Sequence, residues 1–184
     1  MTRHLTWIAL AAAAALVLVL GRQNQALRTE RTALVERATG AYAGMWVPVV
    51  GTATLDGAPV RLGEPARGEA QLLYFFTTTC GYCRASAPAL KQVAARLGKP
   101  VRMIAVTAEA ADTARRYARE HALPFPVASV PDRRVEGLFR ARAVPLLTVV
   151  NADGRATYTR LGELAGKAAI DSVVRAAAAA TTTR

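Results

Sequence analysis

Cysteine, histidine and acidic residues are all scarce in this sequence. Its 184 residues include two cysteines, two histidines and 13 acids, against 24 lysines and arginines. Tetrahedral zinc needs four ligands, and His4 and His121 are both far along the chain from the cysteines. The ligand count therefore argues against a metal site, and we expect no bound metal.

Aromatic side chains make up only 6% of the residues, although the net charge is +11. So basic a chain suggests nucleic-acid binding. Binding of single strands, however, uses aromatic platforms between the basic residues, and here the basic residues alternate with acids instead, as from Glu109 to His121. We expect a solvated basic surface and no nucleic-acid partner.

The sequence has no internal repeat and only one long apolar run, from Leu5 to Leu20. This run follows a short basic start, and about 20 apolar residues suffice to span a bilayer. A signal-peptide cleavage site that ends at Gly21 would be a poor one, because Arg22 follows it directly. We therefore predict an uncleaved signal anchor over residues 1–21, with secretion after cleavage as the alternative.

Good helix formers dominate residues 22–44, which predicts a helical stalk or linker. Leu27 and Leu34 are seven residues apart, as in a coiled coil. The intervening core positions fall on Glu30 or Arg37, which disfavours pairing of two such helices. We expect a monomer, and a dimer through the stalk is the alternative.

The two cysteines, Cys80 and Cys83, are one helical turn apart just after the apolar run 72–76. A strand that leads into a helix at this point would place Cys80 at the helix N-terminus, where unpaired N–H groups and the helix dipole stabilise a thiolate. Cys80 is then the nucleophile, and Cys83 is the resolving thiol that attacks a mixed disulfide. The motif predicts a redox cycle.

The folded body is predicted over residues 45–180, with a frayed tail at 181–184. Asp56-Gly57 separates two short segments as in a β-hairpin. Periodicity and turn residues predict strands over 71–76, 101–106, 146–150 and 155–160, a short extended piece at 126–127, and helices from the cysteines to Gly98 and over 108–121, 132–140 and 163–179. This alternation indicates an α/β sheet with helices on both faces.

The body resembles the thioredoxin fold, in particular the membrane-tethered TlpA/ResA-like branch of thiol-disulfide oxidoreductases. The resemblance covers roughly residues 46–176. It rests on the Cys-Gly-Tyr-Cys motif after an apolar strand, Pro88 five residues after the second cysteine, Val144-Pro145 before a strand, the early Asp56-Gly57 hairpin and the late Asp153-Gly154 turn. It implies a central mixed sheet flanked by helices, with an N-terminal hairpin extension and an N-terminal anchor helix.

The resemblance also implies roles for single residues. Val144-Pro145 would be a cis peptide against the disulfide, and Thr79, Val144 and Pro145 would line the groove that binds a protein substrate. Gly81 and Tyr82 would tune the thiolate, and Pro88 would kink the active-site helix. No cofactor is implied, and the partners would be protein thiols and disulfides, among them a membrane or exported redox protein.

Three positions depart from the family pattern. Thr79 stands where the branch commonly has Trp, Ser86 where it has Glu, and Tyr74 where thioredoxin has a buried Asp. Both carboxylates that could accept the proton of Cys83 are therefore missing. Water, Tyr74 and Ser86 remain as groups that could position protons. The Gly-Tyr dipeptide is similar to that of periplasmic disulfide isomerases, and Tyr82 in place of proline is expected to raise the reduction potential.

Two features of the sequence give opposite predictions for the side of the membrane on which the folded body lies. The basic residues after the anchor, Arg22, Arg28 and Arg31, would keep the body inside under the positive-inside rule. The extreme N-terminal position of the anchor and a tethered Cys-x-x-Cys site favour the exported side. We predict a single-pass protein of the bacterial inner membrane whose catalytic domain faces the periplasm or the cell exterior.

Other interpretations of the cysteine motif are a thiol peroxidase, a metal-handling module and a non-catalytic tethered scaffold. Thr77 precedes Cys80 by three residues, as in peroxiredoxins, but Leu73 occupies the place of their upstream proline. Copper chaperones of this fold add a histidine, which is missing near the motif. A scaffold would have no use for both cysteines and Pro145. We therefore predict a thiol-disulfide oxidoreductase.

Overall fold

The computed structural model describes residues 2–182, which form two separate units divided after Thr39. The first unit is one continuous helix, α1 (Thr2–Thr39), over the predicted anchor and most of the predicted stalk. The side chains of residues 2–6, 8–12, 32–39 and 133 lie outside the described residues, so the apolar run is described only in part. As far as its residues are described, no helix combines the length and apolar character that a membrane crossing requires.

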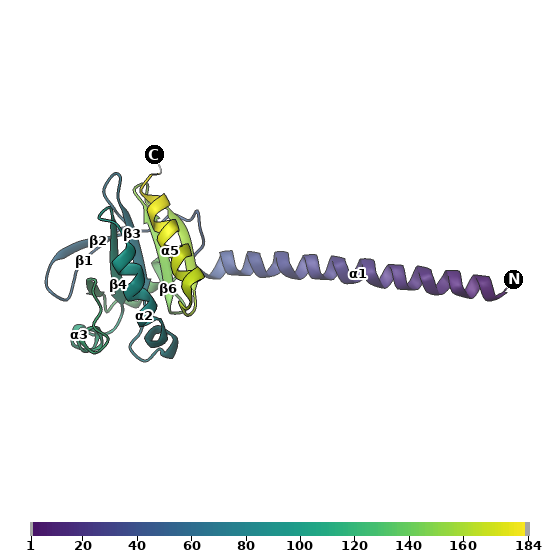
Figure 1. Cartoon of the computed structure of the whole chain (residues 1–184), viewed down its shortest axis with the longest axis horizontal. Coiled ribbons are helices and arrows are strands. Elements are labelled where there is room, and N and C mark those ends of the chain that lie inside the picture. The colour runs from purple at the N-terminus through teal and green to yellow at the C-terminus, as the bar shows by residue number, and fades with distance from the viewer. Residues whose placement is uncertain (1, 183–184) are drawn as a thin grey trace. The chain divides into compact units, whose positions relative to one another are not determined.

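The second unit begins at Gly40 and contains a small sheet and a larger one (Figure 1). The small sheet is the antiparallel pair β1 (Val50–Ala53) and β2 (Pro59–Leu62). Gly57 has a positive φ of 87° in the turn between them, a conformation that glycine adopts at little cost. The predicted Asp-Gly hairpin is therefore present as an element separate from the main sheet.

The larger sheet has five strands in the order β5-β4-β3-β6-β7. These are β3 (Ala70–Phe75), β4 (Val101–Thr107), β5 (Val127–Ser129), β6 (Leu146–Asn151) and β7 (Ala156–Leu161). β3 pairs with β4 in parallel and with β6 in antiparallel, so β3 is central and the sheet is mixed. Every residue of β3 is buried, which explains its continuous apolar run. The predicted thioredoxin-like fold class is confirmed.

Four helices complete this unit: α2 (Gly81–Arg96), α3 (Ala111–Glu120), α4 (Arg133–Leu138) and α5 (Lys167–Ala180). α2 and α5 lie side by side over the main sheet (Figure 1). α2 is continuous with Pro88 inside it, so the proline does not divide it, and α2 ends before Gly98. α5 ends at Ala180, and residues 183–184 of the predicted tail lie outside the described residues.

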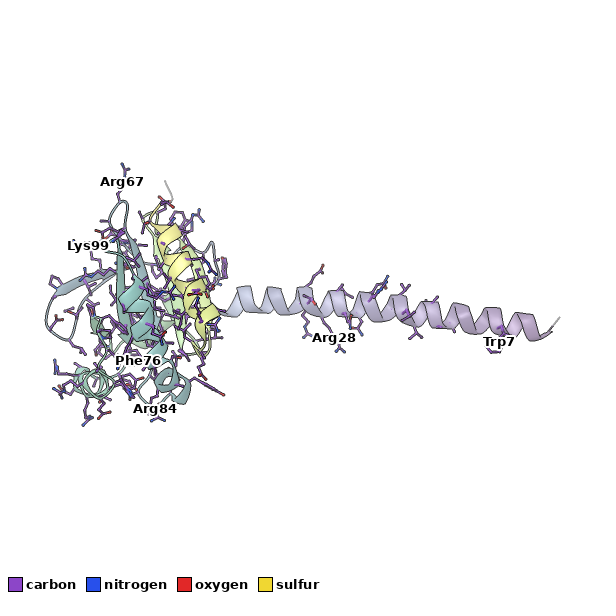
Figure 2. All side chains as sticks on the ribbon, in the orientation of Figure 1. Trp7, Arg28, Arg67, Phe76, Arg84 and Lys99 are labelled. Carbon is purple, nitrogen blue, oxygen red and sulfur yellow. The ribbon has the colours of Figure 1, made fainter. Side chains whose placement is uncertain are left out.

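The main sheet separates two hydrophobic cores, because successive residues of a strand point to opposite faces. On one face, Leu72, Tyr74 and Phe76 pack with Cys83 and with residues of α2, α3 and α5. We call this the dithiol face. On the other, Leu73 and Phe75 pack with residues of α4 and the hairpin, and we call this the apolar face. Figure 2 shows Phe76 inside this unit and Arg84 at its edge.

Candidate active site

Cys80 occupies the N-cap of α2, directly after the central strand and a short threonine loop. Its backbone is extended (φ −74°, ψ 114°), and its Sγ accepts a hydrogen bond from the backbone N–H of Cys83 at 3.1 Å. This N–H belongs to the first turn, whose donors have no partner within the helix. A sulfur that carries negative charge is favoured at such a position.

The two thiols differ in exposure. Both cysteines are free; Cys80 is partly exposed, whereas Cys83 is fully buried. The Cys80 thiol lies 3.8 Å from the carbonyl oxygen of Val144, to which it can donate a weak hydrogen bond. The Val144–Pro145 peptide bond is cis. The structure thus brings Cys80 next to a backbone segment far away in the sequence.

Burial is the main influence on the ionisation of Cys83. It raises the pKa of Cys83 to about 12, with a further rise from its hydrogen bond with Cys80. The backbone of Thr77 and the hydroxyl of Tyr74 act in the opposite direction and lower the pKa of Cys83. Of the two thiols, Cys80 is therefore the one that solvent can reach, and Cys83 is the one that burial holds protonated.

The predicted groove residues lie around Cys80 with different exposure. Thr79 and Gly81 are exposed, and Tyr82 is 66% exposed on the first turn of α2. Val144 is partly exposed, whereas Pro145 is buried and its carbonyl accepts a hydrogen bond from Gly162 at 2.9 Å. An exposed aromatic ring next to a reactive thiol gives a partner protein an apolar surface to contact.

A carboxylate that the sequence analysis did not single out supports the active-site loop. Both carboxylate oxygens of Glu109 accept from the backbone N–H of Thr78 at 3.1 Å, and one also accepts from its hydroxyl. Glu109 follows β4, the parallel neighbour of β3. The carboxyl ends of parallel strands meet at one sheet edge, so this topology could have indicated Glu109 as a partner of the loop.

A small pocket of about 220 Å³ adjoins the loop and the first turn of α2. It is lined by Thr78, Arg84, Thr113, Arg116, Tyr117, Glu120 and His121.

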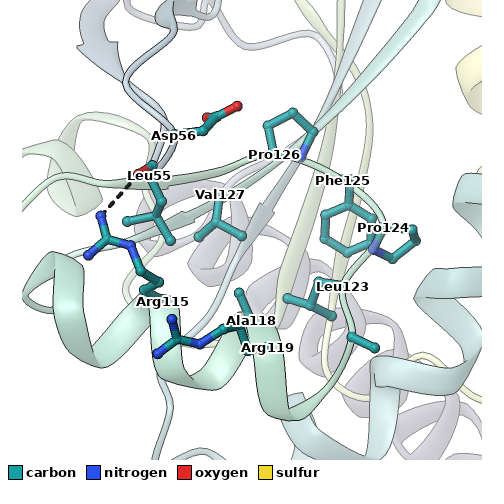
Figure 3. A pocket seen from close by; sticks show the side chains of 11 residues that line it. Leu55, Asp56, Arg115, Ala118, Arg119, Leu123, Pro124, Phe125, Pro126 and Val127 are labelled. Carbon is teal, nitrogen blue, oxygen red and sulfur yellow. Dashed lines mark hydrogen bonds between the residues drawn. The ribbon is translucent and has the colours of Figure 1, made fainter.

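A larger pocket of about 690 Å³ includes neither cysteine (Figure 3). Leu55, Phe125 and Val127 are among its residues, and Arg115 donates a hydrogen bond to the Leu55 carbonyl at 3.0 Å. Among the described residues, no three His, Cys, Asp or Glu side chains are grouped to hold a metal.

Comparisons with known proteins agree with this geometry. The Redoxin family model matches residues 42–175. A comparison with curated protein sequences gives no match.

Several solved structures are similar to the chain at low sequence identity. A candidate thiol:disulfide interchange protein DsbE from Chlorobium tepidum is 23% identical, with a TM-score of 0.65, and the match covers 77% of this chain and 99% of that one. A secreted Mycobacterium tuberculosis disulfide oxidoreductase homologous to Escherichia coli DsbE is 24% identical (TM-score 0.58, coverage 71% and 95%). StoA from Bacillus subtilis is 17% identical (TM-score 0.60, coverage 70% and 96%).

At these identities the structures establish the fold, and the family model establishes the family. The matched range contains the whole main sheet, both cysteines and Pro145. The chain therefore belongs to the Redoxin family and has the thioredoxin-like fold of thiol-disulfide oxidoreductases.

Proposed function

We propose that this protein exchanges disulfides with protein substrates through Cys80 and Cys83, on the exported face of a membrane. The observation that carries the proposal is the pairing of a partly exposed sulfur at a helix N-terminus with a buried one a turn later. The exposed thiolate can attack a substrate disulfide, and the buried thiol is protected until the mixed disulfide has formed.

The step balances as a two-electron exchange. Cys80 Sγ forms a bond to one sulfur of the substrate disulfide, and the other substrate sulfur leaves as a thiolate. Cys83 then attacks Cys80 Sγ, the mixed disulfide breaks, and the Cys80–Cys83 disulfide forms. The substrate gains two electrons and the enzyme dithiol loses two; the reverse sequence oxidises the substrate.

Docking of the substrate is proposed along the segment that faces Cys80. The Val144 carbonyl, 3.8 Å from Cys80 Sγ, offers a backbone acceptor to an extended substrate segment. The exposed Thr79 and Tyr82 border this position. Pairing through backbone groups needs no particular substrate side chain, which suits exchange with several partners.

Tethering is the second part of the proposal. The apolar run from Leu5 to Leu20 would hold the domain at the bacterial inner membrane, facing the periplasm or cell exterior. A tethered domain meets membrane-embedded redox partners at a raised effective concentration. Secretion after signal cleavage is the alternative location, and fractionation of cells that express the full chain distinguishes the two.

The exchange reaction is tested with single-cysteine variants. Cys83→Ser should accumulate a mixed disulfide with substrate proteins, because the resolving thiol is gone, whereas Cys80→Ser should accumulate none. Trapped complexes are counted on non-reducing gels. A scaffold would keep its partners in both variants, and a peroxidase would reduce hydrogen peroxide far faster than free dithiol does.

The direction of exchange follows from the reduction potential of the pair, measured by equilibration with glutathione. A value near that of thioredoxin, about −270 mV, indicates a reductant, and one above about −180 mV indicates an oxidant or isomerase. If the two cysteines form no reversible disulfide, the proposed function is refuted.

A further inference from the structure

The resolving step requires a thiolate at a fully buried position. Cys83 has no exposed surface, and a sulfur that gains charge there loses the solvation that water would provide. Hydrogen-bond donors that point at the sulfur can replace part of that solvation. The identity of these donors therefore decides how fast Cys83 resolves a mixed disulfide.

Two polar side chains close to the motif are already committed elsewhere. The Ser86 hydroxyl donates to the Tyr82 carbonyl at 2.7 Å and accepts from the Leu164 N–H at 2.9 Å. The Glu109 carboxylate is bound by Thr78. Ser86 thus joins α2 to the segment before α5, and Glu109 holds the loop, so neither is available to Cys83.

Tyr74 remains, and it lies beneath Cys83 on the central strand. The side chain is 1% exposed, and its hydroxyl donates to the Cys83 carbonyl oxygen at 3.4 Å. A typical O–H···O bond is about 2.7–2.8 Å, so this one is weak. The ring is held by stacking on Phe76, with centroids 5.6 Å apart and planes 2° from parallel. A hydroxyl that rotates on a fixed ring can turn from the carbonyl to the sulfur of the same residue.

Tyr74 can act only as a donor. Burial, together with the nearby Cys83, raises its pKa far above the ordinary phenol value, so the phenol keeps its proton at any pH at which the protein works. A protonated phenol cannot take the Cys83 proton. It can donate a hydrogen bond to the thiolate that remains once that proton has left.

We propose that the Tyr74 hydroxyl is the side-chain donor that stabilises the Cys83 thiolate in the resolving step, at the position where thioredoxin carries a buried aspartate. This inference rests on the proposed function. In the step, Cys83 loses its proton to solvent and attacks Cys80 Sγ, the Cys80–substrate bond breaks, and the departing substrate thiolate takes up a proton. Tyr74 is a positioning residue whose own covalent bonds do not change.

The chain contains a matched control, because Tyr117 is a second buried tyrosine near the same dithiol. It is 4% exposed and, like Tyr74, stacks on Phe76, with ring centroids 5.0 Å apart. Its pKa is raised to about 12, first by burial and then by the nearby Cys83. Among the described residues, however, its hydroxyl has no hydrogen bond to either cysteine. Tyr74→Phe and Tyr117→Phe each remove one hydroxyl and keep the ring.

The test separates the two steps of exchange in the full chain, with a fluorescent peptide disulfide as substrate. Formation of the mixed disulfide should have the same rate in the parent and in both variants. Its resolution should slow roughly 10- to 100-fold in Tyr74→Phe, the range expected for loss of a hydrogen bond to a charged group. It should not slow in Tyr117→Phe. A partly unfolded variant would lose both steps together, so the ratio of the two rates reports on the hydroxyl alone.

The pH profile of the resolving step gives a readout that a structural role would not change. The groups that act on Cys83 and its surroundings are Cys80, Tyr74, Tyr117, Arg84 and Glu109. Loss of the Tyr74 donor should displace the profile by about one pH unit or more to higher pH, and loss of the Tyr117 hydroxyl should leave it in place. Equal profiles for parent and Tyr74→Phe, or equal displacement in both variants, would overturn the role of Tyr74. Absence of any mixed disulfide in the parent would instead refute the proposed function.

Discussion

The two faces of the main sheet share one backbone but differ in the chemistry that they bury. The apolar face holds Phe75, Phe139 and other hydrophobic side chains from α4 and the hairpin. On the dithiol face the buried side chains include Tyr74, Cys83 and Tyr117, which are the buried titratable groups among the described residues. The apolar face therefore buries no titratable side chain among the described residues, whereas packing on the dithiol face surrounds a thiol and raises its pKa.

The difference arises from the alternation of side chains along β3. Tyr74 points to one face, and its neighbours Leu73 and Phe75 point to the other. A strand that is buried on both faces can therefore carry a polar side chain on one face while the core on the other face stays apolar. The two faces can accordingly be perturbed one at a time.

The largest expected effect comes from a cavity on the apolar face. Phe139 is 1% exposed and its ring contacts that of Phe75, with centroids 5.2 Å apart. Phe139→Ala should lower the free energy of unfolding by about 3–5 kcal/mol, through lost transfer energy and the cavity left behind. Urea denaturation measures this loss. The rate of disulfide exchange per folded molecule should stay within about twofold of the parent, well below the roughly tenfold change expected when a charged thiolate loses a hydrogen bond.

The control for this comparison is Leu90→Ala on α2. Leu90 is fully buried on the dithiol face, so its loss should cost about 2–5 kcal/mol and also change the exchange rate. If Phe139→Ala altered exchange as much as Leu90→Ala does, the two faces would not be separable.

A second prediction concerns alkaline pH, where only the dithiol face should respond. The pKa of Cys83 is raised from about 9 to about 12 in the folded chain, mainly by burial, so the unfolded chain gives up this proton first. The stability of the reduced protein should therefore fall as pH rises through this window, by up to about 1.4 kcal/mol per pH unit for one proton.

The reference for the alkaline prediction is Cys83→Ala. Urea denaturation of both reduced proteins over a pH series cancels the contribution of Tyr117, whose pKa is also raised by burial. The stability difference between them should shrink toward high pH. The stability cost of Phe139→Ala should show no such trend. A stability difference between the parent and Cys83→Ala that stays constant with pH would contradict the buried state of Cys83.

The smallest predicted effect separates structure from reactivity within the dithiol face. Ser86→Ala should lower the free energy of unfolding by about 1–3 kcal/mol, because the Leu164 N–H loses a buried acceptor. Resolution by Cys83 should keep its rate. Ser172, whose contact with the Tyr158 hydroxyl is long at 3.5 Å, is the control, and Ser172→Ala should change stability by less than about 0.5 kcal/mol. Slower resolution in Ser86→Ala would assign Ser86 the part proposed for Tyr74.

Much of the fold could be predicted because its signals are local. The apolar runs of the central strands, the Asp56-Gly57 turn and the cysteine spacing each depend on a few neighbouring residues. Helix ends were less predictable: α3 begins at Ala111, three residues after the expected start at Ala108. A helix end depends on which backbone groups find partners elsewhere in the fold, and periodicity carries no information on this.

The sequence by itself determined which two sulfur atoms make up the proposed redox pair, because only two cysteines exist and their spacing puts them on one turn of helix. Only the tertiary structure decided what surrounds them. The Val144 carbonyl beside Cys80, the Tyr74 hydroxyl beneath Cys83 and the distant bonds of Ser86 and Glu109 join residues far apart in the chain. Contacts of this kind follow from the order of the strands and the alternation of side chains in the folded sheet. They determine which hydrogen-bond donors lie close enough to stabilise a buried thiolate.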